Sequence, residues 1–401
     1  MNEFMMVENK MPRKKSRKEF HKKTVFKGIL WLPKEIIGQI FEKLPDKSLM
    51  RFRCVSKSWD SMISDPNFTK NNQKLLLLSS RSAIQIMDYE GYEGKTGMID
   101  FFDSEKRKSV KVLGSSNGLL CISVGNSSLF LWNLLTGEKK TLRSYRIETG
   151  HDSFGFGYDY STDDYKLVRF ANLRMSSFLV YSMRNNFWKS SQITIPDDAL
   201  QLSSCKAGVL VKNSLYWYAT YVARDFQTYE DSCVICPNNK LRGTQSILIF
   251  SFDVVDETHK MFLPPPCVDS TESEGELMDF KGYLCEVHNH KNNFIDLWIL
   301  KGDADTKKNW MKLMRITRYD TLPKIGVMEP IYFARNGEVL IVFRQGKQKN
   351  KEHGSSIRMT NKLYSYNPTE MSFRRVKLQG KKFWSTEIAY SGRLFSINRQ
   401  L

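Results

Sequence analysis

The chain has 401 residues, 41% of them apolar and 12% aromatic, which is enough for two or three packed domains. Its formal charge of +18 at pH 7 allows an acidic protein, a nucleic acid or an anionic membrane surface as partner. The longest apolar run, Val339 to Phe343, is far shorter than the ~18 residues of a membrane span, and the basic N-terminus lacks the apolar stretch of a secretory signal. Seven scattered cysteines do not form the pattern of a disulfide framework. We therefore expect no membrane association and a location in the cytoplasm, the nucleus or both.

Residues 1–28 form a basic tail that we expect to be disordered. The first 30 residues hold nine Lys or Arg against three Glu, and the cluster from Pro12 to Lys18 has almost no apolar neighbour. Such a cluster can be a nuclear import signal or a nonspecific anion-binding arm. A solvated tail without a receptor is the remaining interpretation.

The stretch from Leu32 to Phe68 predicts three short amphipathic helices. Apolar residues recur at helical spacing between Ile36 and Leu44, in the first helix. A cap at Asp46 or Ser48 can open the second helix, and Ser56 precedes the third. About 35 residues cannot bury all these apolar stripes among themselves, so we expect the surplus apolar face to contact a partner.

This stretch resembles an F-box, the adaptor-binding module of substrate receptors in SCF-type ubiquitin ligases. The resemblance runs through Leu32, Pro33, Glu35, Ile36, Ile40, Leu44, Pro45, Ser48, Leu49, Arg51, Phe52, Arg53, Cys54, Val55, Lys57, Trp59, Ile63 and Phe68. Trp31 and Ser56 depart from it, at the places of a common capping Asp and a common second Cys. It implies an F-box domain at residues 29–70 that docks on a Skp-family adaptor and, through it, on a cullin scaffold. The residues expected to divide between the adaptor contact and the helical core are Leu32, Pro33, Ile36, Ile40, Leu44, Leu49, Phe52, Val55 and Trp59.

From Leu75 onward the chain consists of short β-rich runs separated by Gly, Asn, Asp and Ser. One unit recurs: an apolar strand, a polar turn, and a second strand that begins with a bulky or basic residue. Its copies are Leu129–Leu142, Phe178–Trp188, Ile247–Leu263, Ile295–Leu313 and Leu363–Val376. The companion strands that precede them are Asn117–Cys121, Lys166–Phe170, Asn213–Trp217, Lys281–Cys285 and Asn336–Leu340.

Aromatic residues at equivalent places in these copies lie 49, 71, 46 and 68 residues apart. Spacings near 50, two of them stretched by loops, predict a mainly β chain with a kelch-like β-propeller of about six four-stranded blades. The sixth blade would combine Leu75–Leu78 and Ile84–Met87 with Leu394–Ile397 from the C-terminus. Closing the ring in this way removes exposed strand edges.

Residues 75–401 are also similar to the F-box-associated domain of a large plant family that includes kelch-like and S-locus F-box-like proteins. The matching segments are Gly114–Cys121, Trp132–Gly137, Gly155–Asp159, Asp164–Val168, Val180–Ser182, Leu215–Trp217 and Phe252–Asp253. The similarity implies a non-catalytic subunit that recruits a target protein for ubiquitination and needs no cofactor. A second hypothesis is a basic propeller that binds nucleic acid, or a scaffold without a ligase role. It leaves the F-box pattern unexplained, which argues against nucleic acid as the partner.

The sequence leaves the target and its binding residues unknown. Loops on a rigid scaffold usually carry recognition, so the two longest loops are the candidates. These are Arg224 to Gly243 and the basic segment Arg344 to Asn361. The alternative is that both are flexible insertions without a ligand.

Two glycine motifs match sequence patterns of active sites, but the residues around them do not fit such a site. Gly114–Gly118 matches the nucleophile elbow of hydrolases, with Ser116 as nucleophile, but a strand follows where an elbow needs a helix. Gly155 and Gly157 begin a dinucleotide fingerprint that lacks its third glycine. We therefore expect a tight turn at Gly114–Gly118 and no active site at either motif.

The Cys and His residues give no metal site. Cys233 and Cys236 form a lone CxxC inside the first long loop, without a second pair at zinc-finger spacing. In an alternating strand, Cys285 faces away from His288 and His290. The sequence therefore predicts no metal and no active site.

Overall fold

Two units make up the chain, Met1–Thr69 and Lys70–Leu401, and each is described by itself. The structure is a computed structural model. None of the helices it describes is long and apolar enough to cross a membrane. The residues it describes are 32–44, 46–65, 73–78, 83–88, 95–100, 110–125, 128–142, 152–171, 177–192, 200–202, 206–222, 245–266, 275–290, 294–302, 310–318, 327–334, 336–349, 356–377 and 386–391.

The first unit contains the three helices that the sequence predicts: α2 (Lys34–Lys43), α3 (Asp46–Arg53) and α4 (Lys57–Ser64). Pro33 stands at the N-cap of α2, where its carbonyl accepts the backbone N–H groups of Ile36 and Ile37. Ser56 caps α4, because its side chain accepts the backbone N–H of Trp59 at 3.1 Å. Ser56 thus caps the third helix as predicted, whereas Asp46 is the first residue of α3 and Ser48 lies inside it.

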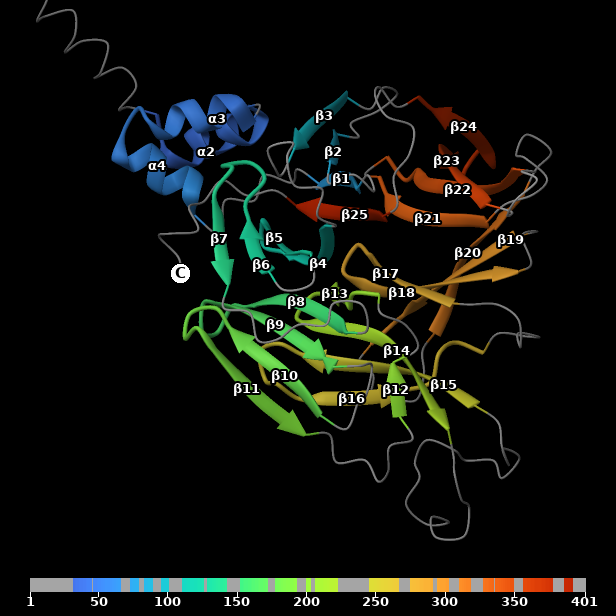
Figure 1. The fold of residues 1–401 in the computed structure, drawn as a ribbon. Coiled ribbons are helices and arrows are strands. Elements are labelled where there is room, and N and C mark those ends of the chain that lie inside the picture. Colours follow the sequence, from blue (N-terminus) through green and yellow to red (C-terminus); the bar gives the residue numbers. More distant parts are fainter. Residues whose placement is uncertain are drawn as a thin grey trace, which may run out of the picture. The chain divides into compact units, whose positions relative to one another are not determined.

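The second unit is a β-propeller of six sheets among the described residues, five with four strands and one with five (Figure 1). The predicted propeller of about six blades is thereby confirmed. Blade 1 contains β1 (Gln73–Leu78), β2 (Ala83–Asp88), β3 (Lys95–Asp100) and β25 (Thr386–Ser391). Blade 2 contains β4 (Val110–Ser116), β5 (Leu119–Val124), β6 (Ser128–Trp132) and β7 (Lys139–Leu142). Blade 3 contains β8 (Ser153–Asp159), β9 (Asp164–Phe170), β10 (Ser177–Ser182) and β11 (Phe187–Gln192).

The other three blades follow the same plan of antiparallel neighbours. Blade 4 contains β12 (Leu200–Leu202), β13 (Val209–Val211), β14 (Ser214–Val222), β15 (Gln245–Asp253) and β16 (His259–Phe262); β12 and β13 both pair with β14. Blade 5 contains β17 (Gly275–Phe280), β18 (Tyr283–His290), β19 (Phe294–Leu300) and β20 (Trp310–Thr317). Blade 6 contains β21 (Val327–Phe333), β22 (Val339–Lys349), β23 (Ser356–Asn367) and β24 (Ser372–Val376).

A strand from the end of the chain closes the ring. β25 pairs with β1 in antiparallel register from Gln73 opposite Ser391 to Leu78 opposite Thr386. The sequence had assigned this role to Leu394–Ile397, which lies outside the described residues. The closing strand instead comes from Thr386–Ser391, whose mixture of polar and apolar residues is a weaker strand signal.

Asn and Asp side chains shape the turn between the third and fourth strands of several blades. Asn133 accepts the backbone N–H groups of the residues two and three positions later in blade 2, Asp253 does the same in blade 4, and Asn367 in blade 6. The last residue of each turn has positive φ, at Gly137, Asn186, Glu257 and Met371. This local chemistry explains the recurring sequence unit.

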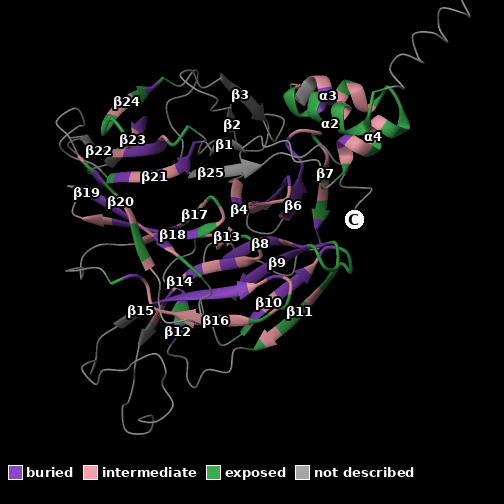
Figure 2. Cartoon of the chain, turned by 180° about the vertical axis from the view of Figure 1, so that it is seen from behind, coloured by how far each residue is buried: buried purple, intermediate pink, exposed green. Residues whose placement is uncertain are grey.

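The hydrophobic core lies between neighbouring blades. The cluster between blades 2 and 3 includes Leu119, Leu131, Phe156 and Tyr181, and similar clusters join blades 3 and 4 and blades 5 and 6. The outer strands contribute less: all of β9 is buried, whereas β11 is exposed or half-buried throughout (Figure 2). Among blades 2 to 6, neighbouring blades are therefore joined by apolar packing between their faces.

Candidate functional site

An apolar stripe stays exposed on α2 in the helical unit. Ile36 and Ile40, four residues apart on one side of the helix, are 40% and 44% exposed, and Leu32 just before the helix is 45% exposed. Val55, after the end of α3, is 51% exposed. Single exposed apolar residues are ordinary, but a row of large aliphatic side chains indicates a contact surface. We call Leu32, Ile36 and Ile40 the α2 stripe.

The opposite side of α2 packs into a small core. Phe41, Leu49 and Ile63 are each at most 2% exposed. The Phe41 ring lies 5.0 Å from that of Trp59, and the Phe52 ring lies 5.4 Å from Trp59, both edge-on. This aromatic group fixes the three helices against one another.

The nine residues predicted for the F-box thus fall into two groups. Phe41 was not among them, although its spacing from Ile37 and Leu44, four and three residues, places it on one side of α2 with them. The core group is Leu49, which is buried, together with Phe52, Trp59 and Leu44, which are half-buried. The exposed group is Leu32, Pro33, Ile36, Ile40 and Val55.

An ion pair holds α3 against α4. Arg53 Nε donates to Asp60 Oδ1 at 2.7 Å, and both side chains are less than one-fifth exposed. Asp60 also accepts a hydrogen bond from Ser64 at 3.3 Å. The pair constrains the chain between the helices, where Val55 lies.

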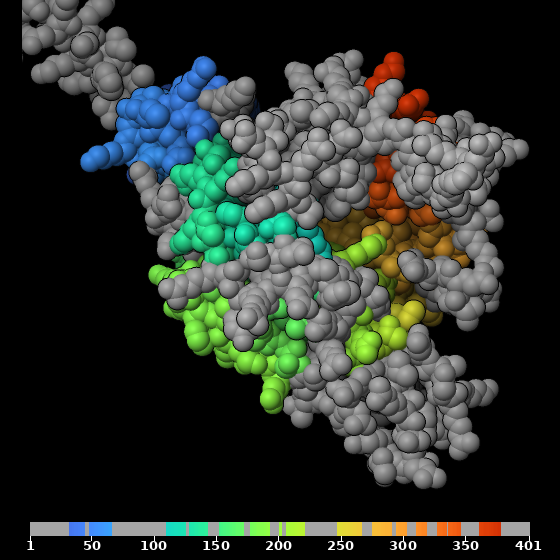
Figure 3. Space-filling view, in the orientation of Figure 1, coloured from blue at the N-terminus to red at the C-terminus, as the bar shows by residue number. Residues whose placement is uncertain are grey.

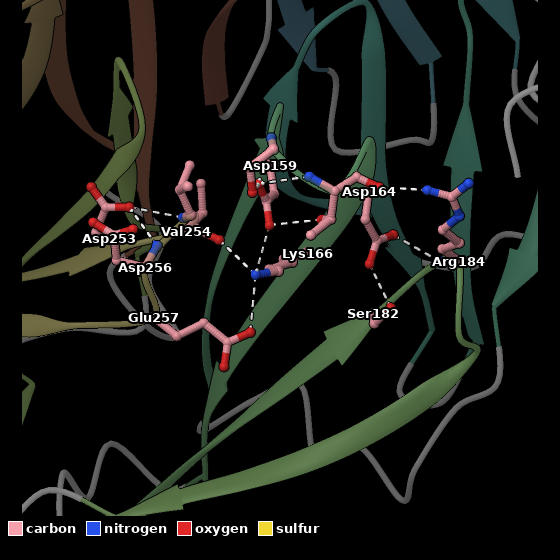
Figure 4. Close-up of polar contacts among 12 residues, drawn as sticks. Asp159, Asp164, Lys166, Ser182, Arg184, Asp253, Val254, Asp256 and Glu257 are labelled. Carbon is pink, nitrogen blue, oxygen red and sulfur yellow. Dashed lines mark hydrogen bonds and ion pairs between the residues drawn. The ribbon is translucent and has the colours of Figure 1, made fainter.

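In the propeller, the amine of Lys166, on β9 of blade 3, has three polar partners. It lies 3.0 Å from Asp159 and 2.9 Å from Glu257, and it donates to the carbonyl of Val254 at 2.8 Å (Figure 4). Val254 and Glu257 belong to the turn between β15 and β16, in blade 4. Lys166 therefore joins two neighbouring blades.

Charge attraction decides the ionisation of this group. Burial opposes the charged form of Lys166, but hydrogen bonds and attraction from Glu257 and Asp159 raise its pKa above the usual value. Burial also opposes the charged form of Asp159, yet hydrogen bonds from Ser161, Thr162 and Lys166 lower its pKa to about 2. Both partners are therefore charged at neutral pH, as in a structural ion pair.

The two glycines of the incomplete fingerprint have a packing role. A Cβ atom on Gly155 would lie 2.5 Å from the Trp217 ring, and one on Gly157 would lie 2.8 Å from Val254. Because only glycine leaves room for these blade 4 side chains, β8 can approach the next blade closely. The same segment, Gly155–Asp159, thus supplies both the close contact and the carboxylate for Lys166.

Comparison with known proteins assigns both units to families. Residues 29–71 match the F-box domain, and residues 55–396 match the F-box associated beta propeller domain, which spans well over half of the chain. The chain belongs to the F-box associated β-propeller family. The residues that carried the resemblance in the sequence, such as those around Lys166, are thus structural residues of this family's propeller.

Relatives of this F-box protein occur in Arabidopsis thaliana. An F-box/kelch-repeat protein is 27% identical over 79% of this chain and 86% of its own length, and a second F-box protein is 27% identical over 92% of both chains. The F-box protein CPR1 is 23% identical over 78% of this chain and 79% of its own. A solved oligogalacturonate lyase is 11% identical over 69% of this chain and 70% of its own with a TM-score of 0.36, too weak a likeness to carry an argument.

The structure of this F-box protein also places the other residues of the active-site and metal patterns that it describes in a turn or in the core. Ser116 ends β4, and the next element is the strand β5, so the motif is a hairpin turn. Cys285 is fully buried in the core between blades 5 and 6, and burial raises the pKa of its thiol to about 12. In the part of the chain that is described, no group of three or more His, Cys, Asp or Glu is placed to hold a metal. Cys233 and Cys236 lie outside the described residues.

Of the two loops predicted as candidates for target binding, the structure describes only the second, and that only in part. Residues 224–243 lie outside the described residues. Most of the segment from Arg344 to Asn361 is not a loop: β22 extends to Lys349 and β23 begins at Ser356, paired in unbroken register. The expectation of a loop was wrong because charged side chains leave the backbone hydrogen bonds of the ladder intact.

Proposed function

We propose that this F-box protein is the substrate receptor of an SCF-type ubiquitin ligase. Its F-box would dock on a Skp-family adaptor and thereby on a cullin scaffold, while its propeller holds a target protein for ubiquitination. The observation that carries the proposal is an F-box with an exposed apolar stripe in the same chain as a closed propeller.

The α2 stripe has the chemistry of a helix that docks in an apolar groove. Such helices use large apolar side chains about one turn apart, as in Leu32, Ile36 and Ile40. Full burial of one such side chain contributes about 1.5–3 kcal/mol. Three of them, with Val55 beside the next helix, would supply much of the affinity of a stable complex.

A receptor of this kind needs no reacting group. It acts by holding the target near the enzyme that carries ubiquitin, which raises the effective concentration of the target's lysines. We propose the cytoplasm, the nucleus or both as its location, with Pro12–Lys18 as the segment that would direct nuclear import.

Binding of the Skp-family adaptor to the full-length chain, measured by calorimetry, tests the proposal. We expect Ile36→Glu/Ile40→Glu to weaken binding by more than ~100-fold, because each change places a charge in an apolar contact. The matched control is Glu42→Lys, an exposed residue away from the stripe on the same helix, with affinity within about twofold of the wild type. Equal affinity of the stripe variant and the wild type, or no adaptor binding by the wild type, would refute the proposal.

A further inference from the structure

Blade 6 carries the densest positive charge among the described strands. β22, β23 and β24 contain seven Lys or Arg and no Asp or Glu. The four strands of the neighbouring blade 5 contain four acidic residues and only two Lys or Arg. The excess on blade 6 is therefore local and does not merely follow the basic composition of the chain.

Acidic neighbours neutralise only part of this charge. Arg344 pairs with Glu329 at 2.6 Å, and Arg374 lies 3.5 Å from Glu338. Lys362, Arg375 and Lys377 have no acidic partner among the described residues, and Arg375 and Lys377 are exposed. We call these three residues the blade 6 basic surface.

The strand register brings two of these cations together. Arg375 lies opposite Tyr364, and Lys362 lies two residues from Tyr364 on the same face of the sheet. Phe343 lies opposite Lys362, and the guanidinium of Arg318, at the end of β20, lies 5.0 Å from the Phe343 ring centroid. Lys362 and Arg375 thus continue a row of positive charge that begins at the edge of blade 5.

The outer strand β24 also offers an open edge. Among the described strands it pairs with β23 alone, from Ser372 to Val376. The space-filling view shows side chains at the red end of the colour scale, which includes β24, at the surface (Figure 3). Cations on such an edge deter pairing with the edge of another sheet, but they favour a strand of opposite charge.

We propose that the blade 6 basic surface binds an extended acidic segment of a partner protein, which adds to β24 as a further strand. Backbone hydrogen bonds would hold the segment, and its carboxylates would face Lys362, Arg375 and Lys377. This inference deepens the proposed function, since the partner would be the recruited target. Its test needs no ligase subunit, so it can fail while adaptor binding succeeds.

The aromatic residues of this region favour a peptide over nucleic acid. Proteins that bind single-stranded nucleic acid stack the bases on exposed rings. Here Phe343, Tyr364 and Tyr366 are at most 8% exposed because they pack into the core between blades 5 and 6, and Phe373 on β24 is half-buried against the same core. A peptide needs no such platform, because the edge itself supplies its hydrogen bonds.

Fluorescence anisotropy with the full-length chain and a labelled peptide of alternating Glu and Thr tests this inference. We expect binding that weakens as salt is raised, and a loss of at least ~10-fold in Lys362→Glu/Arg375→Glu. Lys301→Glu, the same charge reversal at an exposed residue of blade 5, is the control and should change affinity by less than about twofold. If the reversed pair does not fold, Lys362→Gln/Arg375→Gln replaces it, with a loss of at least about threefold.

Hydrogen exchange then separates strand addition from diffuse attraction. Added peptide should slow amide exchange within β24 and leave the outer strand of blade 3, β11, unchanged. Equal losses in the blade 6 and Lys301 variants, or unchanged exchange in β24, would overturn the inference. Tighter binding of a single-stranded RNA of equal charge than of the peptide, through the same residues, would also overturn the inference.

Discussion

Lys166 is the residue on which the junction between blades 3 and 4 depends most. Its side chain is only 8% exposed, that of Asp159 is fully buried, and Glu257 adopts a positive φ of 54° in the turn that places its carboxylate. A left-handed backbone is unfavourable for a residue with a side chain, and it persists here because the surrounding contacts fix it. Lys166, Asp159 and Glu257 thus form one network of ion pairs.

Removing the Lys166 amine should therefore destabilise the propeller. Lys166→Met leaves Asp159 buried without its cation, and we expect a loss of about 3 kcal/mol in the free energy of unfolding. Lys189→Met, which removes a cation that is 64% exposed and also pairs with Glu257, should cost less than ~1 kcal/mol. Urea unfolding of both variants measures the difference, and equal losses would contradict the role given to Lys166.

Asp159 should make the free energy of unfolding depend on pH in the acidic range. Its folded pKa of about 2 lies below the unfolded value, so its contribution is complete above about pH 4 and is lost as the pH falls through 2. Between pH 4 and pH 2 the wild type should lose about 2 kcal/mol more stability than Asp159→Asn does. Urea midpoints at several pH values test this, and parallel curves for the two proteins would argue against it.

At the scale of the elements, the turns of the blades could be predicted, whereas the extent of some strands and the packing role of Gly155 and Gly157 could not. Asn133, Asp253 and Asn367 mark turns because the side chain itself bonds the backbone, a signal local to the sequence. The ends of β22 and β23 depend on cross-strand pairing, which composition does not encode. The charge of segment 344–361 therefore predicts a loop, where the structure has two paired strand ends.

The close approach of β8 to blade 4 gives a prediction for one element. Gly155→Ala would place a methyl group against the Trp217 ring, and overpacking of this kind costs about 1–3 kcal/mol. Gly38→Ala, in α2 with nothing within 4 Å of the added carbon, should instead stabilise its helix by about 1 kcal/mol. Thermal unfolding of the two variants should therefore shift in opposite directions.

At the scale of the molecule, the sequence predicts a closed ring but assigns the closing strand to other residues than β25. Closure itself could be predicted, because an open ring leaves strand edges exposed. Local apolar content favours Leu394–Ile397, whereas the strand that pairs with β1 is Thr386–Ser391. In the F-box the helices were predictable from periodicity, but a stripe as wide as Ile36–Leu44 does not show which residues face inward.

Two truncations test the closing strand. A chain that ends at residue 391 keeps all of β25 and should therefore still close the ring and stay in solution. A chain that ends at residue 385 leaves an edge of β1 unpaired and should aggregate or unfold at lower temperature. Sedimentation and thermal unfolding measure both, and a stable monomer ending at residue 385 would show that β25 is dispensable.

The receptor role is tested most directly by the mass of the complex that the full-length chain forms with a Skp-family adaptor. Light scattering on the eluting peak gives that mass without labels. We expect a one-to-one complex, which Ile36→Glu/Ile40→Glu abolishes while the chain stays folded. A folded wild-type chain that elutes separately from the adaptor at micromolar concentrations would refute the receptor role.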